Sequence, residues 1–273
     1  MSAKREIMTF IIGALLIYLA ATAAMYFGQR SFIYFPDPNR QNRATYQAGD
    51  MDVIHAKTSD GLTLEGWYKA PQGDKPVIVV FHGNASHMGM SAWKVQPYLE
   101  AGYGALLPAY RGYAGNPGKP TEAGLYNDAR AFLHWLETDK GIPENRIVLL
   151  GESLGTGVAV EMAATDFPSI RGLILESPYT SFGDLASTHY PFIPFAGSLV
   201  RDRYDSIRKI KKVKAPLLVV HGRQDVVVPF ALGERLYRAA NEPKQMAVIP
   251  LAGHNDLYSY GAGERILHFL STL

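Results

Sequence analysis

The sequence contains no cysteine in its 273 residues, which excludes disulfide bonds, a thiolate nucleophile and cysteine-ligated metals. An excess of one charge is also missing, because 27 Lys and Arg residues face 25 Asp and Glu residues. With no nucleic-acid-binding signature either, we predict no nucleic-acid partner. No H-E-x-x-H metal motif occurs, and Gly118-Lys119-Pro120 has proline where a phosphate-binding loop needs Ser or Thr. We therefore expect an activity that uses no cofactor and no metal.

One long hydrophobic run is present, near the N-terminus. Ile7 to Phe27 carries no charge, and its roughly twenty residues would cross a hydrocarbon layer of about 30 Å as a helix. A cleaved signal peptide could use Lys4-Arg5 as its basic region and Ala21-Thr22-Ala23 as its cleavage site. We favour a retained anchor instead, because the apolar run continues through Met25-Tyr26-Phe27.

The predicted organisation is an N-terminal membrane anchor over residues 1–30, a linker over 31–50 and a catalytic domain over 51–273. Positive charges on the two sides of the anchor do not choose its orientation, since Lys4 and Arg5 face Arg30, Arg40 and Arg43. We expect a single-pass membrane protein whose catalytic domain is extracytoplasmic.

Strand-like and helix-like segments alternate from residue 51 onward, and no internal repeat is visible. This alternation predicts an α/β fold with a mostly parallel eight-stranded sheet that carries helices on both faces. The predicted strands are 51–57, 62–69, 77–81, 103–108, 147–150, 172–175, 217–220 and 246–249. The predicted helices are 91–101, 121–138, 154–164, 229–240 and 262–270, with a start at Thr121-Glu122 and a stop at Gly141.

Ser153 stands between two glycines in Gly151-Glu152-Ser153-Leu154-Gly155, directly after the predicted strand 147–150. A G-x-S-x-G pattern at a strand-to-helix turn is typical of a nucleophile elbow, because the glycines allow a sharp, strained turn that exposes the serine hydroxyl. Ser153 is therefore the candidate nucleophile.

A serine hydroxyl needs a base and an orienting carboxylate, and in this topology they follow in the order acid, then histidine. Asp225 follows the strand 217–220, and His254 follows the strand 246–249. We favour Asp225 as the acid, while Glu176 at the end of the strand 172–175 remains a rival. His221 is interpreted as a turn residue that bonds the local backbone.

The oxyanion of a tetrahedral intermediate needs main-chain donors, each worth roughly 3 kcal/mol in the transition state. We expect one from the N–H of Leu154, which follows the nucleophile, and one from the N–H of Asn84 in the loop after the strand 77–81.

Together these segments resemble the α/β-hydrolase superfamily from about residue 51 to the C-terminus, and within it the membrane-anchored serine hydrolases with one span and a short cap. The resemblance implies Ser153, Asp225 and His254 as the catalytic triad. Ser86-His87 departs from the Gly-Asn that such enzymes often carry after the alanine, which concerns only the shape of the oxyanion loop. The similar segments are 81–85, 110–113, 151–155, 177–179 and 253–256.

A short cap is expected at about residues 179–212. Its aromatic, Pro-rich part, Tyr190 to Phe195, could line an acyl pocket, touch the bilayer or pack on the core. In the basic stretch 201–214, Ile207, Ile210 and Val213 recur every three residues, which favours an amphipathic helix over a headgroup site.

These features predict a membrane-anchored serine hydrolase that cleaves esters or thioesters with apolar acyl groups, acylated proteins included. Two alternatives stay open. A serine peptidase would need acidic residues for a peptide terminus, with Asp184 and Asp202 as candidates. A non-catalytic, membrane-bound interaction module would not need the three catalytic residue types at strand ends.

Overall fold

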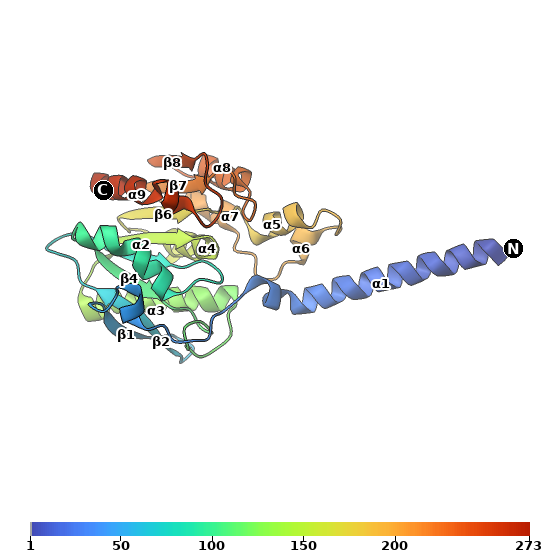
Figure 1. The fold of residues 1–273 in the computed structure, drawn as a ribbon, viewed down its shortest axis with the longest axis horizontal. Coiled ribbons are helices and arrows are strands. Elements are labelled where there is room, and N and C mark those ends of the chain that lie inside the picture. The colour runs from blue at the N-terminus through green and yellow to red at the C-terminus, as the bar shows by residue number, and fades with distance from the viewer. Residues whose placement is uncertain (1) are drawn as a thin grey trace.

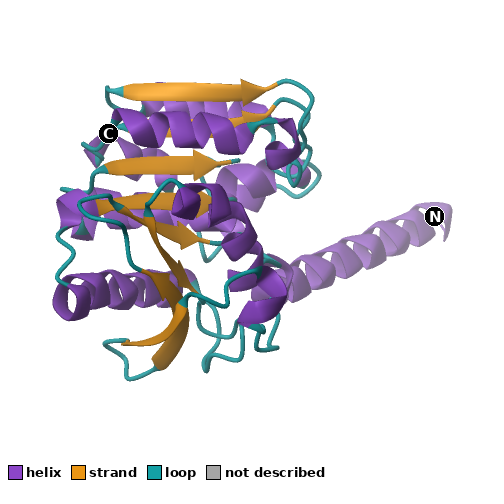
Figure 2. Cartoon of the chain, turned by 60° about the vertical axis from the view of Figure 1, so that its left-hand side comes forward, coloured by secondary structure: helices purple, strands orange, loops and turns teal. Residues whose placement is uncertain are grey.

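A computed structural model describes residues 2–273. Its centre is a single eight-stranded sheet in the order β1-β2-β4-β3-β5-β6-β7-β8, in which only the pairs of β2 with β1 and β4 are antiparallel (Figures 1 and 2). The predicted α/β fold with a mostly parallel eight-stranded sheet is therefore confirmed. The strands are β1 Asp52–Lys57, β2 Thr63–Lys69, β3 Val77–Phe81, β4 Gly104–Pro108, β5 Ile147–Glu152, β6 Gly172–Glu176, β7 Leu217–Gly222 and β8 Lys244–Ile249.

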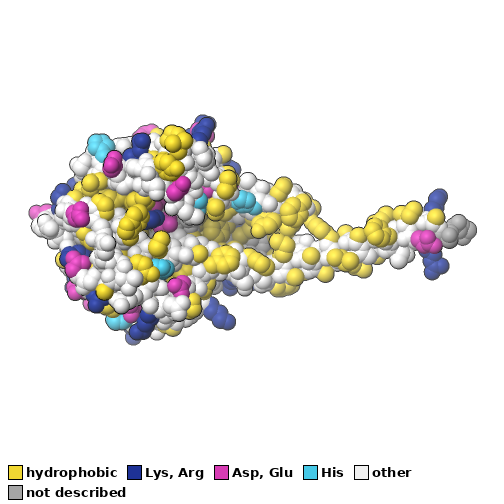
Figure 3. All heavy atoms as spheres, viewed as in Figure 1, with side chains coloured by type: hydrophobic (Ala, Val, Ile, Leu, Met, Phe, Trp, Pro, Cys, Tyr) yellow, Lys and Arg dark blue, Asp and Glu magenta, His cyan; other side chains and the backbone are white. Residues whose placement is uncertain are grey.

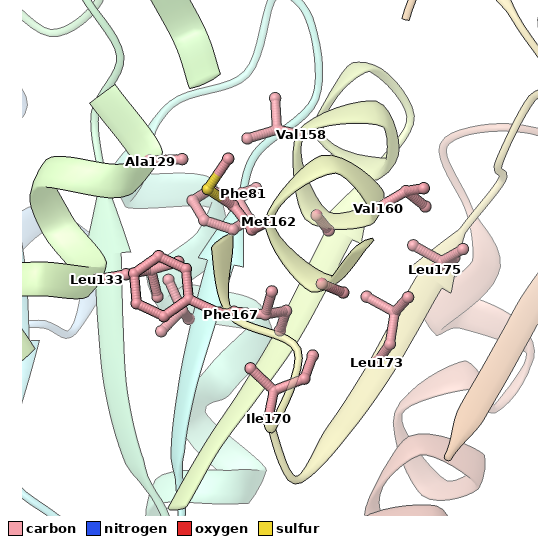
Figure 4. Packing of buried hydrophobic residues seen from close by; sticks show 14 of the residues in the cluster. Phe81, Ala129, Leu133, Val158, Val160, Met162, Phe167, Ile170, Leu173 and Leu175 are labelled. Atoms are coloured by element: carbon pink, nitrogen blue, oxygen red, sulfur yellow. The ribbon is translucent and has the colours of Figure 1, made fainter. Parts of the chain in front are cut away.

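Helices cover both faces of this sheet, as predicted, and each face has its own apolar core. On β3, Val77, Val79 and Phe81 pack into one core while Ile78 and Val80 pack into the other, which is the period-two alternation of a strand. A continuous apolar run suits such a strand, since neither face meets water. Figure 4 shows the first core, where Phe81 lies among side chains of α3 and α4.

The helices of the domain are α2 Met88–Glu100, α3 Glu122–Lys140, α4 Leu154–Glu161, α8 Phe230–Ala239 and α9 Ala262–Thr272. Helices α3, α4 and α8 contribute to the first core, and α2 and α9 to the second. The predicted signals around α3 are confirmed. Thr121 caps its N-terminus by accepting a hydrogen bond from the Gly124 amide, and Gly141 ends it in the left-handed region.

Helix α1, Ser2–Ile33, projects away from the domain (Figure 1). Over its best 18-residue window the mean hydropathy is 2.2, and none of that window is buried by the rest of the chain. The segment after it lies on the domain: the Phe35 amide donates to Asn84 Oδ1 (2.9 Å) and the Ala114 amide to the Asp37 carbonyl (2.8 Å).

The chain between β6 and β7 forms the cap, with helices α5 Phe182–His189 and α6 Ala196–Leu199. The amphipathic helix predicted in residues 201–214 is shorter than expected: α7 covers Ser206–Lys209, and a 3-10 turn covers Ile210–Lys212. Ile207 lies in α7, Ile210 in the 3-10 turn and Val213 just after it, so a spacing of three does not distinguish the two kinds of helix here. Ile210 and Val213 are buried, so the apolar side of the prediction is correct.

Candidate active site

Ser153 occupies a strained turn between β5 and α4. Its φ of 49° and ψ of −113° lie where a residue with a side chain is rarely found. The flanking glycines are required by close packing: a Cβ on Gly155 would lie 1.9 Å from the Phe81 carbonyl oxygen, and one on Gly151 would lie 2.6 Å from the Gly155 carbonyl oxygen. The turn thus has the geometry of a nucleophile elbow, with the serine partly exposed.

Three predicted residues, distant in sequence, meet at the carboxyl edge of the sheet. His254 Nε2 lies 3.0 Å from Ser153 Oγ, and His254 Nδ1 lies 2.7 Å from Asp225 Oδ2. Ser153 follows β5, Asp225 lies in the loop after β7 and His254 in the loop after β8. Figures 1 and 2 show the arrowheads of the parallel strands pointing to the side from which α1 and the cap project.

Asp225 is held as a carboxylate that can only accept hydrogen bonds. Burial alone would raise its pKa, but hydrogen bonds from His221, His254 and the Val228 amide outweigh burial and hold the pKa well below its usual range. An ionised Asp225 requires a proton on His254 Nδ1, which leaves Nε2 as the acceptor facing the Ser153 hydroxyl. This is the protonation state that a general base needs.

Glu176, the rival acid, faces a different partner. It is buried, and its oxygens accept hydrogen bonds from Lys94 Nζ (3.2 Å) and the Tyr258 hydroxyl (2.6 Å). The geometry therefore selects Asp225 as the partner of His254.

Lys94 of α2 belongs to a buried ionic cluster that the sequence analysis missed. Its ammonium also lies 2.8 Å from Glu152, the residue before Ser153. Burial disfavours the charged form of both carboxyl groups. At Glu152 the charge and hydrogen bond of Lys94, together with His82 and His254, outweigh burial and lower the pKa, whereas at Glu176 burial dominates and the pKa is raised. The one signal in the sequence was a glutamate at the end of each of two strands, β5 and β6; they pair directly in the sheet.

The loop after β3 lies against the elbow. A Cβ on Gly83 would lie 3.4 Å from the carbonyl oxygen of Glu152, so the predicted oxyanion loop and the nucleophile turn are neighbours. The Asn84 side chain bonds its own loop and the linker: Oδ1 accepts from the Ala85 amide (3.1 Å), the Phe35 amide and the Tyr113 hydroxyl (3.0 Å), and Nδ2 donates to the Ile33 carbonyl. Leu154 is the first residue of α4, where an amide has no acceptor within the helix.

The partners of four further polar side chains are as follows. His221 is buried at the end of β7 rather than in a turn; its Nε2 lies 2.9 Å from the Val228 carbonyl, the predicted local backbone bond, and 3.3 Å from Asp225 Oδ2. The aspartates proposed for a peptide terminus are both in ion pairs, Asp202 with Arg30 (2.8 Å) and Asp184 with Arg235 (3.3 Å). Arg111, in the loop after β4, forms ion pairs with Asp60 and Asp128. Within residues 2–273 no group of three or more His, Asp or Glu side chains could hold a metal ion.

Comparison with known proteins agrees with this fold. Residues 78–211 match the alpha/beta hydrolase family, and the chain belongs to that family. An uncharacterised protein of Mycobacterium tuberculosis is 43% identical over 232 residues, 84% of this chain and 81% of the relative. YfhR of Salmonella typhi, also uncharacterised, is 31% identical over 270 residues, 91% of this chain and 90% of the relative. Among solved structures, an esterase of Pyrococcus furiosus superposes with a TM-score of 0.71 at 20% identity, covering 88% of this chain and 98% of that one.

Proposed function

We propose that this chain is a serine hydrolase that cleaves carboxylic esters or thioesters through an acyl-enzyme on Ser153. The observation that carries the proposal is the continuous hydrogen-bonded series Ser153–His254–Asp225 at the carboxyl edge of the sheet, with distances of 3.0 Å and 2.7 Å. Membership of the alpha/beta hydrolase family supports the same reaction class.

In the proposed mechanism Ser153 Oγ attacks the substrate carbonyl carbon while its proton passes to His254 Nε2. The resulting oxyanion accepts hydrogen bonds from the amides of Leu154 and Asn84. When the bond to the leaving group breaks, the imidazolium returns the proton to the leaving oxygen or sulfur. Water then attacks the acyl carbon while its proton passes to His254 Nε2. When the bond to Ser153 Oγ breaks, the imidazolium returns that proton to Ser153 Oγ, and the acid product leaves. Asp225 holds the imidazole in the required orientation and stabilises its charged form.

A peptidase is less well supported, because both candidate carboxylates for a peptide terminus are engaged in ion pairs. A non-catalytic scaffold would not require the strained backbone at Ser153, which costs of order 1–3 kcal/mol and exposes one hydroxyl. Apolar acyl groups are favoured as substrates by the aromatic cap beside the proposed anchor.

A covalent probe tests the reaction directly. We expect a fluorophosphonate to label the full chain, and Ser153→Ala to abolish both labelling and ester hydrolysis, a loss of about 10⁴-fold or more. Ser271→Ala, at an exposed serine of α9, is the matched control and should retain full labelling. Labelling of Ser153→Ala at the rate of the unmodified chain would refute the proposal. A panel of acetyl to C16 esters would then give the acyl preference.

We further propose that α1 is a retained single-pass anchor and that the catalytic domain is extracytoplasmic. Lys4 and Arg5 precede the span while Arg30, Arg40 and Arg43 follow it, so the positive charges do not choose the side, and the orientation is tested directly. Because the chain has no cysteine, Glu242→Cys introduces a unique thiol on the domain. We expect an impermeant maleimide to modify this thiol on intact cells. A thiol that reacts only after lysis would reverse the assigned orientation.

A further inference from the structure

The cap runs alongside the C-terminal half of α1, and a series of contacts fixes the two in register. Close to the domain the Tyr34 and Tyr204 hydroxyls are 2.9 Å apart, and Arg30 forms two hydrogen bonds with Asp202 (2.8 and 3.1 Å). Farther out, Gln29 accepts from the Arg201 amide (2.7 Å) and donates to the Leu199 carbonyl (3.2 Å). At the tip, the Tyr18 hydroxyl donates to the Phe192 carbonyl (3.4 Å).

On both α1 and the cap the uncharged stretch ends at the same distance from the domain. In α1 the residues from Ile7 to Gln29 are uncharged and Arg30 is the first ion; in the cap Tyr190 to Val200 is uncharged and Arg201 is the first ion. Arg30 and Arg201 therefore mark one boundary for both segments. Figure 3 shows hydrophobic side chains covering both, with the visible charges of α1 at its N-terminal end.

If α1 spans the membrane, its contacts with the cap fix how deep the cap lies in the bilayer. Tyr18 lies nine residues before Phe27, which is about 14 Å along the helix axis. A tilt of about 20° shortens this depth only slightly. A segment in contact with Tyr18 thus lies well inside a hydrocarbon layer about 30 Å thick.

The tip of the cap, residues 190–196, has side chains and backbone groups that suit a hydrocarbon environment. Phe192 and Phe195 are 69% and 83% exposed, so protein does not cover them. Pro191 and Pro194 have no N–H, and the amides of Tyr190, Ile193 and Ala196 donate to carbonyls within the cap, so the amides of Phe192 and Phe195 are the donors left between Tyr190 and Ala196. Internal satisfaction of backbone groups is what a lipid environment demands.

The cap also touches the candidate site. His189, at the end of α5, lies with Nε2 2.9 Å from the Val227 carbonyl, and the Val227 amide donates to Asp225 Oδ1 (2.9 Å). A cap embedded in the bilayer therefore places the candidate site at the membrane boundary.

We propose that Tyr190–Val200 is a second membrane-embedded element and that the enzyme acts on acyl chains supplied by bilayer-resident esters rather than by water-soluble ones. The inference rests on the proposed ester hydrolase and its anchor. The hydrocarbon layer covers the exposed aromatic tip, and long acyl chains reach Ser153 laterally, along the cap.

The depth is measured with single-cysteine variants of the full chain, labelled with an environment-sensitive fluorophore in phosphatidylcholine vesicles that contain doxyl lipids. Ile17→Cys on α1 is the reference for the span, Phe192→Cys tests the cap, and Glu242→Cys, at the opposite edge of the sheet, is the aqueous control. We expect quenching at 17 and 192 but not at 242. Quenching at 17 without quenching at 192 overturns this inference alone, whereas no quenching at 17 overturns the anchor and with it the inference.

The substrate source is tested with the double variant Phe192→Glu/Phe195→Glu. We expect hydrolysis of a C16 umbelliferyl ester in vesicles to fall about tenfold or more, because two charges must enter the hydrocarbon, while hydrolysis of soluble nitrophenyl acetate stays within about twofold. Val53→Glu, at an exposed valine of the edge strand β1, should change neither rate. An unchanged vesicle rate in the double variant overturns the inference; loss of both rates in Ser153→Ala reports the chemistry separately.

Discussion

The interior of the hydrolase domain and the tip of the cap use the same aromatic residue in opposite ways. Phe81 of β3 is fully buried against α3 and α4 (Figure 4), while Phe195 of the cap is 83% exposed. Phe192 and Tyr190 beside it are exposed as well. A contiguous exposed apolar patch marks an interaction surface. The domain covers most of its large apolar side chains with its own helices, with Trp93, Val226 and Leu251 as exposed exceptions. The exposed aromatic side chains of the cap lie together, and we assign their cover to lipid.

The largest expected effect tests this contrast by truncating one phenylalanine from each region. Phe81→Ala should lower the free energy of unfolding by about 3–5 kcal/mol, because it removes buried contacts and leaves a cavity. Phe195→Ala should change it by less than about 0.5 kcal/mol, since no packing is lost. Guanidinium unfolding of the full chain in detergent micelles measures both. Similar losses for the two variants would place Phe195 in a protein contact and break the comparison.

The ionic contacts of the two regions sharpen the comparison. Lys94 lies between two largely buried carboxylates, so Lys94→Met should cost about 3 kcal/mol by leaving their charge uncompensated. Arg30 pairs with Asp202 at the foot of the cap; the Arg30 side chain is 42% exposed but that of Asp202 only 6%, so Arg30→Met should cost less than Lys94→Met, about 1–2 kcal/mol.

The same unfolding assay measures both variants. Adding Glu176→Gln to Lys94→Met should restore part of the stability, because it removes one of the stranded carboxyl groups. If Arg30→Met proves as costly as Lys94→Met, the cap is held to the anchor by protein contacts more firmly than we infer.

A pH series gives the smallest effect. His82 is fully buried, its Nδ1 lies 2.8 Å from the Gly83 carbonyl, and burial lowers its pKa to about 4 from 6.5. The folded state therefore binds fewer protons than the unfolded state between these values, so stability is full above about pH 6.5 and falls as the pH drops towards 4. The loss reaches at most about 3 kcal/mol.

His82→Gln should flatten this part of the pH profile, whereas His189→Gln, at an exposed histidine of the cap, should keep it. Unfolding midpoints between about pH 7 and pH 4 provide the measurement. An unchanged slope in His82→Gln would show that other groups carry the acid sensitivity.

Much of the domain could be predicted because its elements are specified locally. Val77 to Phe81 is an unbroken apolar run, and Thr121 and Gly141 frame α3 with ordinary helix signals. The spacing of Ile207, Ile210 and Val213 was interpreted as an α-helix because a period of three lies close to 3.6 over so short a segment. Only the packed structure distinguishes the 3-10 turn.

The candidate site was predictable in part for a related reason. Parallel strands deliver the residues that follow them to one edge, so Ser153, Asp225 and His254 could be brought together from their places after β5, β7 and β8. Lys94 could not, because it lies 82 residues before Glu176 in a helix with no motif around it, and a lysine there is ordinarily expected to be solvated.

By itself the sequence indicated the nucleophile turn, because a G-x-S-x-G pattern directly after an apolar run is a local signal. The contact that makes Gly155 obligatory is with the Phe81 carbonyl, which only the fold brings there. Only the tertiary structure decided which acid faces His254 and that the cap lies along the anchor. Arg30 and Asp202 are 172 positions apart, and their pairing depends on the whole path of the chain between them. Local periodicity and propensity carry no information about contacts at that separation.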